Sequence, residues 1–266
     1  MEIIAEKQRK RKRLAFKFKA YSTIIFFSLL IVFALYLLIQ TNIFKIKNIE
    51  VVQLNINQSE TQKIIGKYKI FLAGQSKIKA ILGTDNILVW ENSEEFLKSQ
   101  PHISEFSIEK DYLNREVKIK ISDREKFGIW CLSGQNPSNC WWFDKYGLIF
   151  EKAPLVEGEM IYKINDFSGR DLKIGDLAIS GYLFQNLSKI FGVLEKLEIN
   201  IRTFQLSELS SQEISTESAL YPKIYFSLRI DPNLSIATLQ SLKKTGWNKI
   251  EYIDLRVENR AFYKLK

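Results

Sequence analysis

The longest apolar segment of the chain lies close to its start. Ala20 to Ile39 contains no charged residue, and its only polar members are Ser22, Thr23 and Ser28. At a helical rise of about 1.5 Å per residue, a segment of this length spans about 30 Å, the thickness of a bilayer's hydrocarbon core. The pattern therefore predicts one transmembrane helix at residues 20–40.

Charge predicts the orientation of this helix. Residues 1–19 contain eight Lys and Arg and two Glu, which gives them +6 of the chain's net charge of +9. Basic segments beside a membrane span stay in the cytoplasm. We therefore expect a cytoplasmic tail at residues 1–19 and an extracytoplasmic location for the bulk of the chain. A basic run is also typical of nucleic-acid binding, but beside a membrane span orientation is the favoured interpretation.

A cleaved signal peptide is the main alternative to a permanent anchor. Its apolar core would be about 7–15 residues long and would end in small residues at a cleavage site. Here the apolar core is longer and continues into Leu38-Ile39-Gln40-Thr41-Asn42-Ile43-Phe44 without such a site. We therefore expect an uncleaved, single-pass anchor in the cytoplasmic membrane.

Strand and helix signals are mixed in the segment that follows. Phe44–Leu54 predicts a short strand. Ser59-Glu60-Thr61-Gln62 is a capping-box pattern, and it predicts a helix that continues to about Leu82, interrupted or weakened at Gly66 and Gly74. Asn92 and Glu95 offer a second helix start, and a short helix is expected at Glu94–Ser99, before Pro101.

The clearest alternation of apolar and charged positions predicts a β-hairpin between Ile103 and Ile121. The positions expected to be buried are Phe106, Ile108, Val117, Ile119 and Ile121, and those expected to be exposed are Glu105, Glu109, Lys118 and Lys120. Alternation of this kind indicates strands with one buried face. The order strand, helix, helix, strand, strand predicts a small α+β domain at residues 43–124.

The remaining residues, 125–266, show mostly strand signals. The predicted strands are Phe127–Leu132, Cys140–Phe143, Leu148–Phe150, Ile224–Ile230, Ile250–Val257 and Ala261–Leu265. A polar loop at 133–139 and a turn at Asp144–Gly147 separate the first three. Helical spacing of Leu183, Phe184, Leu187, Phe191 and Leu194 predicts one helix, and Ser235 is expected to cap a second that ends at Gly246. We predict an antiparallel sheet decorated by helices.

Catalytic motifs are absent from the sequence. His102 is the only histidine, and its place after Pro101 is typical of an exposed or capping residue. One histidine and two separated cysteines make no zinc site, and the glycines do not form a phosphate-binding run. We therefore expect no enzyme activity, no catalytic or metal-binding residue and no cofactor.

Cysteines and tryptophans gather in the first part of the second domain. Cys131 and Cys140 flank one loop, and they either form a disulfide or remain as small buried side chains. Trp130, Trp141 and Trp142 lie on adjacent strands, where packing across the sheet is favoured over a ligand platform.

Several motifs, in this order along the chain, resemble those of the bacterial cell-division proteins FtsQ/DivIB. They are Gly83-Thr84-Asp85-Asn86-Ile87-Leu88, the hairpin Pro101–Lys110 with Leu113–Ile119, the junction Ile121-Ser122-Asp123-Arg124, the turn Trp142–Phe150, and Ile253-Asp254-Leu255-Arg256. The resemblance implies that residues 43–124 form a polypeptide-transport-associated (POTRA) domain. The chain departs from the family at Glu125 and Lys126, where a proline and a small residue are usual.

The resemblance further implies a non-catalytic scaffold at the division site. Such proteins link early and late division proteins, recruit bitopic coiled-coil partners of the FtsB/DivIC and FtsL types, and regulate septal peptidoglycan synthesis. They use no nucleic acid and no small-molecule substrate. The alternatives are a membrane-anchored cell-wall enzyme, which would need a cleft with two inward carboxylates, and a POTRA-bearing secretion or assembly factor.

Partner binding is expected at the C-terminal hairpin. If the last strand lies at the sheet edge, a partner segment can pair with its open backbone groups. The predicted binding residues are Tyr252, Asp254, Arg256, Val257, Asn259, Ala261, Phe262 and Tyr263. Protection of the edge by Lys264 and Lys266 is the simpler alternative.

Overall fold

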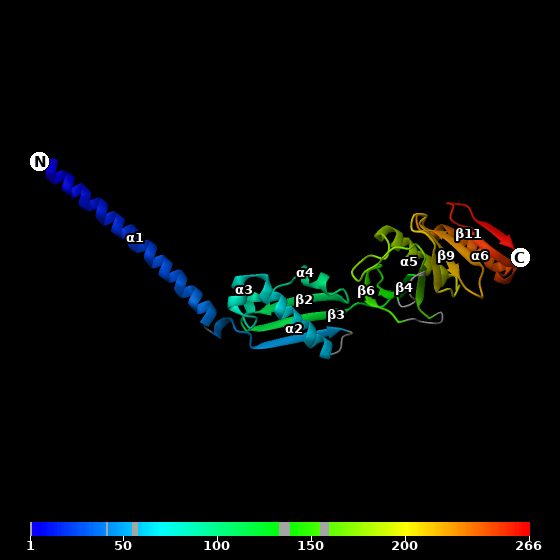
Figure 1. Cartoon of the computed structure of the whole chain (residues 1–266), viewed down its shortest axis with the longest axis horizontal. Helices are drawn as coiled ribbons and strands as arrows, with labels where there is room; N and C mark the ends of the chain where they lie inside the picture. The colour runs from blue at the N-terminus through cyan, green and yellow to red at the C-terminus, as the bar shows by residue number, and fades with distance from the viewer. Residues whose placement is uncertain (1, 41, 55–57, 133–138, 155–159) are drawn as a thin grey trace. The chain divides into compact units, whose positions relative to one another are not determined.

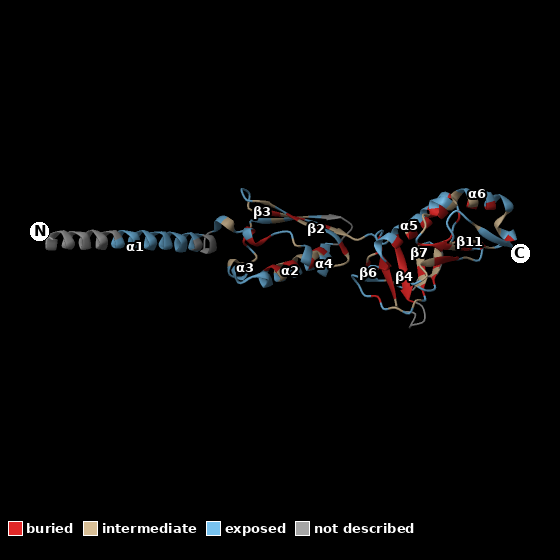
Figure 2. Ribbon diagram, turned by 90° about the horizontal axis from the view of Figure 1, so that it is seen from above, coloured by how far each residue is buried: buried red, intermediate tan, exposed pale blue. Residues whose placement is uncertain are grey.

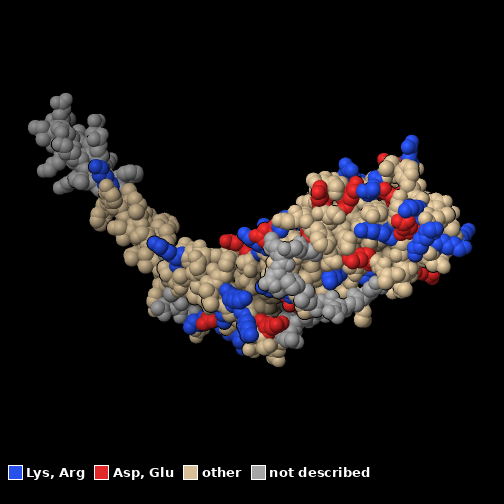
Figure 3. Space-filling model, turned by 45° about the vertical axis from the view of Figure 1, so that its right-hand side comes forward, with Lys and Arg blue, Asp and Glu red and all other residues tan. Residues whose placement is uncertain are grey.

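The computed structural model describes residues 2–40, 42–54, 58–132, 139–154 and 160–266. Its first element, α1 (Glu2–Gln40), is one continuous helix. Within it, Lys17–Ala34 is long and apolar enough to cross a membrane, and none of this stretch is buried. Figure 3 shows this part of α1 as a largely uncharged surface. The side chains of the basic tail before Lys17 lie outside the described residues.

Contacts between residues divide the chain into two compact units (Figure 1). The first contains residues 1–96 and 106–121, and the second contains residues 97–105 and 122–266. The division at residue 122 lies close to the domain boundary that the sequence places after Arg124. The segment 97–105, which the sequence assigns to the first domain, is grouped with the second unit.

The first unit is an α+β structure with a three-stranded sheet of order β1-β3-β2. Its strands are β1 (Asn48–Leu54), β2 (Ile103–Asp111) and β3 (Glu116–Asp123), and its helices after α1 are α2 (Gln58–Gln75), α3 (Lys77–Leu82) and α4 (Glu94–Ser99), with short 3-10 turns at Asn42–Phe44 and Ile87–Val89. Figure 2 shows the helices as a layer on one side of the sheet. Asn48 of β1 contacts Glu116 of β3, and Glu50 contacts Lys118, two residues further along both strands. Residue numbers that rise together on both strands indicate that β1 and β3 are parallel.

The predicted hairpin and its buried face are confirmed. Phe106, Ile108, Val117, Ile119 and Ile121 are all buried. Phe106 packs with aromatic side chains of the helices: the ring centroids of Tyr68 and Phe96, and of Tyr68 and Phe106, lie 4.7 Å apart. The alternation read from the sequence therefore has the correct register.

The start of the first predicted helix and the exact place of its interruption differ from the prediction. The structure begins α2 at Gln58, so Ser59 lies inside the helix instead of capping it. The helix is interrupted at Ser76, two residues after the predicted weak point at Gly74, whereas it continues through Gly66. The Ser76 hydroxyl accepts a hydrogen bond from the backbone N–H of Lys79 and caps α3. A serine side chain competes with the helix backbone for such donors, which explains a new start at this position.

The start of α4 is correct in position, but its cap is a different residue. Ser93 Oγ accepts a hydrogen bond from the backbone N–H of Phe96 at 3.2 Å. The Asn92 side chain instead accepts from the backbone N–H of Ile108 in β2, at 2.7 Å. Asn92 therefore ties the loop before α4 to the sheet, a long-range role that a local pattern does not reveal.

The hairpin register can be tested by introducing aspartate separately at two neighbouring positions, one that faces the core and one that faces solvent. Ile119→Asp places a carboxylate in the core and should destabilise the first unit by roughly 4 kcal/mol or more. Lys118→Asp changes a half-exposed side chain that pairs with Glu50, and should leave the unfolding midpoint nearly unchanged. Chemical denaturation of both variants measures the difference, and equal damage would contradict the register.

The second unit contains one nine-stranded sheet of order β12-β11-β10-β9-β8-β7-β4-β5-β6. The strands are β4 (Gly128–Leu132), β5 (Cys140–Phe143), β6 (Ile149–Lys152), β7 (Tyr162–Asp166), β8 (Thr203–Leu206), β9 (Glu213–Glu217), β10 (Lys223–Ser227), β11 (Ile250–Leu255) and β12 (Phe262–Leu265). The helical elements are α5 (Gly181–Lys196), α6 (Ile236–Thr245), and 3-10 turns at Pro232–Ser235 and Trp247–Lys249. The sequence predicts neither β7, β8 nor β9.

The prediction of an antiparallel sheet is wrong, because the sheet is mixed. Three neighbouring pairs are parallel, namely β4 with β7, β7 with β8, and β10 with β11. Two of these pairs are joined by a connection that contains a helix: α5 lies between β7 and β8, and α6 lies between β10 and β11. A parallel pair needs such a crossover to return the chain to the starting end of the sheet. The two helices that the sequence predicts in this unit, α5 and α6, therefore form the crossover connections of two parallel strand pairs.

Helix α5 covers the main core of the second unit. The five apolar residues whose spacing predicts this helix, Leu183, Phe184, Leu187, Phe191 and Leu194, are all buried. They pack with inward side chains of the sheet and with Leu239 and Leu242 of α6. Figure 2 shows both helices on the same side of the sheet. The helical periodicity therefore predicts the inward face of α5 correctly.

The two cysteines lie opposite each other in β4 and β5 and form a disulfide, with their Cα atoms 4.1 Å apart. They pack with Trp142 in a small separate cluster, whereas Trp130 and Trp141 belong to the main core. All three indole side chains are buried, so the prediction of packing is confirmed. The predicted polar loop at 133–139 falls outside the described residues except for Asn139.

Candidate protein-binding edge

The last strand, β12, forms one edge of the nine-stranded sheet, as the sequence predicts. It pairs with β11 in antiparallel register, with Ile253 opposite Tyr263 and Asp254 opposite Phe262. On its other side no strand is found within the described ranges. Alternate backbone N–H and C=O groups of an edge strand point away from the sheet. A further strand can therefore pair with β12 without displacing any element.

The opposite edge, β6, is covered by a later loop. The backbone N–H of Ile149 donates to the carbonyl of Asp176 at 2.9 Å, and the N–H of Gly175 donates back to Ile149 at 2.7 Å. Leu148 and Leu177 form an additional antiparallel bridge. These bonds use the outward backbone groups at the start of β6, so the sheet has one covered edge and one open edge.

The side chains of β12 leave both faces of the strand accessible. Phe262, Tyr263 and Leu265 are 52%, 53% and 53% exposed, although neighbouring β11 contains the fully buried Ile253. Lys264 forms an ion pair with Glu251 at 2.8 Å. Three half-exposed apolar residues in one short strand are a hydrophobic surface that a partner strand would cover.

Arg256 fixes the strands behind this edge. Its guanidinium donates two hydrogen bonds to Asp254, at 2.9 and 2.6 Å, and one to Glu213 of β9 at 2.8 Å. It also lies over the Tyr225 ring of β10, 5.0 Å from the centroid. The hydrogen bonds from Arg256 hold the pKa of Asp254 below its usual value. Arg256 therefore connects three strands, and its guanidinium is engaged within the sheet.

A small pocket of about 180 Å³ opens at the end of the C-terminal hairpin. Val257, Asn259 and Ala261 line it from the connection between β11 and β12. Leu234 lines it from the 3-10 turn before α6, and Thr238 lines it from the first turn of α6. The pocket is large enough for an apolar side chain and lies next to the open edge.

All eight predicted binding residues lie on β11, β12 or their connection: Tyr252, Asp254, Arg256, Val257, Asn259, Ala261, Phe262 and Tyr263. They divide into three sets: Phe262 and Tyr263 on the open strand, three residues at the pocket, and Tyr252, Asp254 and Arg256 within the sheet. Glu213 and Tyr225, which hold Arg256, are not among the predicted residues. These partners depend on strand order, and the sequence pattern carries no signal for it.

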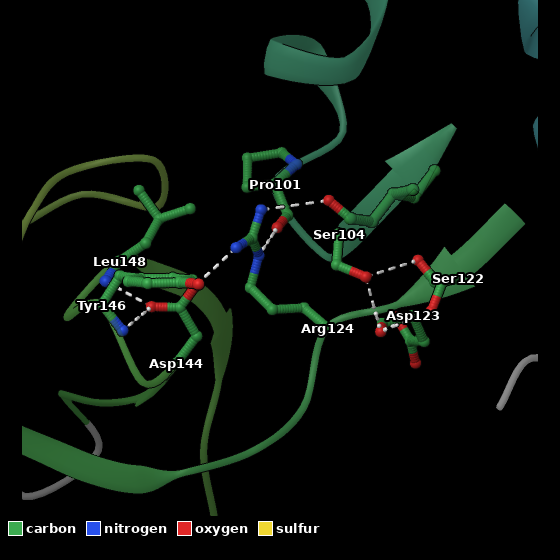
Figure 4. Close-up of polar contacts among 9 residues, drawn as sticks. Pro101, Ser104, Ser122, Asp123, Arg124, Asp144, Tyr146 and Leu148 are labelled. Carbon is green, nitrogen blue, oxygen red and sulfur yellow. Dashed lines mark hydrogen bonds and ion pairs between the residues drawn. The ribbon is translucent and has the colours of Figure 1, made fainter. Parts of the chain in front are cut away.

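A second polar cluster joins two of the sequence motifs within the second unit (Figure 4). Arg124 donates hydrogen bonds to the carbonyl oxygens of Pro101, at 2.8 Å, and Ile103, at 3.1 Å, and it pairs with the Asp144 carboxylate. The other Asp144 oxygen accepts from the backbone N–H groups of the 146–148 turn. The acidic–Arg junction and the Asp–Gly turn are thus physically linked.

Among the described residues of the second unit, the two buried carboxylates are engaged in structural contacts. Asp144 pairs with Arg124, and Asp166 accepts hydrogen bonds from Trp130, Ser168 and Arg170. Burial raises the pKa of Asp166, but hydrogen bonds led by Ser168 outweigh this effect and leave its pKa below the usual value. These contacts do not favour acid–base chemistry at either residue.

The described residues contain no group of three or more His, Cys, Asp or Glu placed to bind a metal ion. Comparison of the chain with models of known protein families and with curated proteins finds no match.

Proposed function

We propose that this chain is a non-catalytic, membrane-anchored scaffold that captures an extended segment of a partner by strand addition at β12. The observation that carries the proposal is the open edge strand, with its outward backbone groups and three half-exposed apolar side chains. Backbone hydrogen bonds would give the affinity, and the side chains beside them would give the specificity. The adjacent pocket offers a site for one apolar anchor of the partner.

The partner class follows from the resemblance to FtsQ/DivIB. We propose that β12 receives bitopic coiled-coil division proteins of the FtsB/DivIC and FtsL types, and that the chain links them to other division proteins at the septum. The first unit supports this proposal because its short sheet and its helix layer have the size and composition expected of a POTRA domain. Regulation of septal peptidoglycan synthesis would then be indirect, through the recruited partners.

The proposal requires a defined membrane topology. With α1 as an uncleaved anchor, the +6 charge of residues 1–19 should hold the N-terminus in the cytoplasm. A reporter that is active only outside the cytoplasm should be active when fused after Lys266 and inactive when fused before Met1. The opposite result would reverse the orientation and remove β12 from the compartment of the proposed partners.

Depletion of the protein in the bacterium that encodes it tests the cellular role. We expect undivided filaments, because late division proteins would no longer reach the septum. Re-expression of the full chain should restore division, whereas a chain that lacks residues 261–266 should reach the membrane and fail to do so. Normal division during depletion would exclude the scaffold function.

A further inference from the structure

The segment that follows α1 is fixed to two surface features of the first unit. The Arg115 guanidinium donates to the carbonyl of Asn42 at 2.8 Å, and the backbone N–H of Lys47 donates to the carbonyl of Arg115 at 2.8 Å. On the other side, the backbone N–H of Ile46 donates to the carbonyl of Asp85 at 2.8 Å. The turn between β2 and β3 and the turn after α3 therefore both lie beside the exit of α1 (Figure 1).

These two features carry exposed apolar side chains. On α3, Ile78 and Ile81 lie three residues apart on one helical face and are 71% and 65% exposed. At the hairpin turn, Tyr112 and Leu113 are 54% and 95% exposed. Ile43, in the connecting segment, is also exposed. We call these five residues the exit face. Isolated exposed apolar residues are ordinary, but five around one short segment form a patch.

Basic residues flank the exit-face residues in the sequence. Lys45, Lys47 and Lys77 are exposed, and in the described part of the chain they form no ion pair with a carboxylate. Lys110 lies over the Tyr112 ring, 5.7 Å from its centroid. A patch that combines apolar and tyrosine side chains with lysines has the composition of membrane-interface segments, where lysines contact anionic headgroups.

The distance to the membrane is fixed by the chain itself. The apolar run of α1 ends at Ile39, and Asn42, which Arg115 binds, follows three residues later. Three residues reach at most about 10 Å, even when fully extended. The interfacial layer extends about 5–8 Å beyond the hydrocarbon core. If α1 spans the bilayer, Asn42 and the bound Arg115 therefore lie in this layer or at its outer boundary, with the exit face beside them.

We propose that the exit face is a second membrane contact, which rests on the outer leaflet of the bilayer that α1 crosses. Leu113, Ile78 and Ile81 enter the boundary between headgroups and acyl chains, and Lys45, Lys47 and Lys77 bind anionic phospholipid headgroups. This proposal rests on the membrane anchoring in the proposed function. It adds that the first unit is held against the membrane instead of swinging from a flexible tether.

Depth-dependent fluorescence quenching in nanodiscs tests this contact. The native cysteines are paired in a disulfide, so a Leu113→Cys variant of the full chain takes an environment-sensitive dye at one position. Glu60→Cys is the matched control, because it is exposed in the first turn of α2, whereas the exit face lies beyond the last turn. The nanodiscs contain phosphatidylcholine with or without phosphatidylglycerol.

In phosphatidylglycerol nanodiscs, we expect lipids with a quencher near the headgroup to quench the dye at residue 113 strongly. Aqueous iodide should quench it several-fold less than the dye at residue 60. Lys45→Glu with Lys47→Glu should weaken the lipid quenching, and removal of phosphatidylglycerol should do the same. A dye at residue 113 that iodide reaches as readily as the dye at residue 60 would overturn the proposal.

The same preparation separates this proposal from the anchoring on which it rests. A chain that inserts into nanodiscs but leaves residue 113 in water contradicts the exit face alone, and leaves the scaffold function standing. A chain that does not insert removes the anchor, and with it both proposals. Quenching at residue 113 without any dependence on anionic lipid would contradict the role given to the lysines.

Discussion

Phe262→Pro is expected to weaken capture of the coiled-coil partners by one to two orders of magnitude. Proline has no backbone N–H and is poorly tolerated within a paired strand. The change removes a donor from β12 and disturbs its pairing opposite Asp254. Loss of about two to three backbone hydrogen bonds to a partner, at about 1 kcal/mol each, weakens binding roughly 30–150-fold. Titration of the full chain in detergent with the extracytoplasmic segment of the partner measures this loss.

Phe262→Ala is the matched control for that experiment. It removes the same half-exposed ring but keeps the backbone N–H, so binding should weaken less than tenfold. Deletion of residues 261–266 should reproduce the effect of proline, and Tyr263→Ala should have an intermediate effect. Equal weakening by alanine and proline would show that side chains, and not strand addition, dominate the affinity. Undiminished binding after the deletion would place the partner site elsewhere on the chain.

Arg124→Ala is expected to be among the most destabilising substitutions in the second unit. Asp144 is 3% exposed, and the substitution leaves its carboxylate without a cation while also removing two hydrogen bonds to backbone carbonyls. Breaking a buried ion pair in this way costs about 3–5 kcal/mol. For a domain of this size, the thermal midpoint should fall by roughly 6–20 °C. Differential scanning calorimetry measures the change.

Two further variants distinguish the buried pair from surface charge. Lys126→Ala removes a half-exposed partner of Glu151, and its effect should be small. Combining Arg124→Ala with Asp144→Asn removes the uncompensated charge but keeps an oxygen for the backbone N–H groups at residues 146 and 148. The double variant should therefore be more stable than Arg124→Ala alone. If Arg124→Ala were as harmless as Lys126→Ala, the pair would not contribute to folding.

Local periodicity predicts the elements whose burial is decided by neighbouring residues in the sequence. The hairpin around Ile119 and the inward face of α5 are correct because one face of each element meets a core. β7, β8 and β9 are missed for the opposite reason. They are only four or five residues long, and their burial depends on strands that are distant in the sequence. Too few alternating positions remain to distinguish such a strand from a loop.

At the candidate site too, the sequence predicts features that depend on nearby residues and misses contacts between residues that are distant in the sequence. The sequence predicts the edge position of β12, and within the described residues β12 pairs only with β11. The engagement of Arg256 with Glu213 and Tyr225 requires the order β9-β10-β11, which includes a parallel pair across α6. Likewise, Arg124 and Asp144 belong to separate motifs in the sequence, and their contact appears only once the chain is folded.

The unequal edges of the large sheet limit how the protein can assemble. Because the loop at residues 175–177 covers the start of β6, a second copy that added its β12 there would meet this loop, which disfavours head-to-tail growth into a filament. Pairing of β12 with β12 meets no such loop among the described residues and gives an arrangement with twofold symmetry. That dimer would occupy the backbone groups that a partner needs. Self-association through this sheet and partner capture therefore exclude each other, so local crowding of the protein would compete with recruitment.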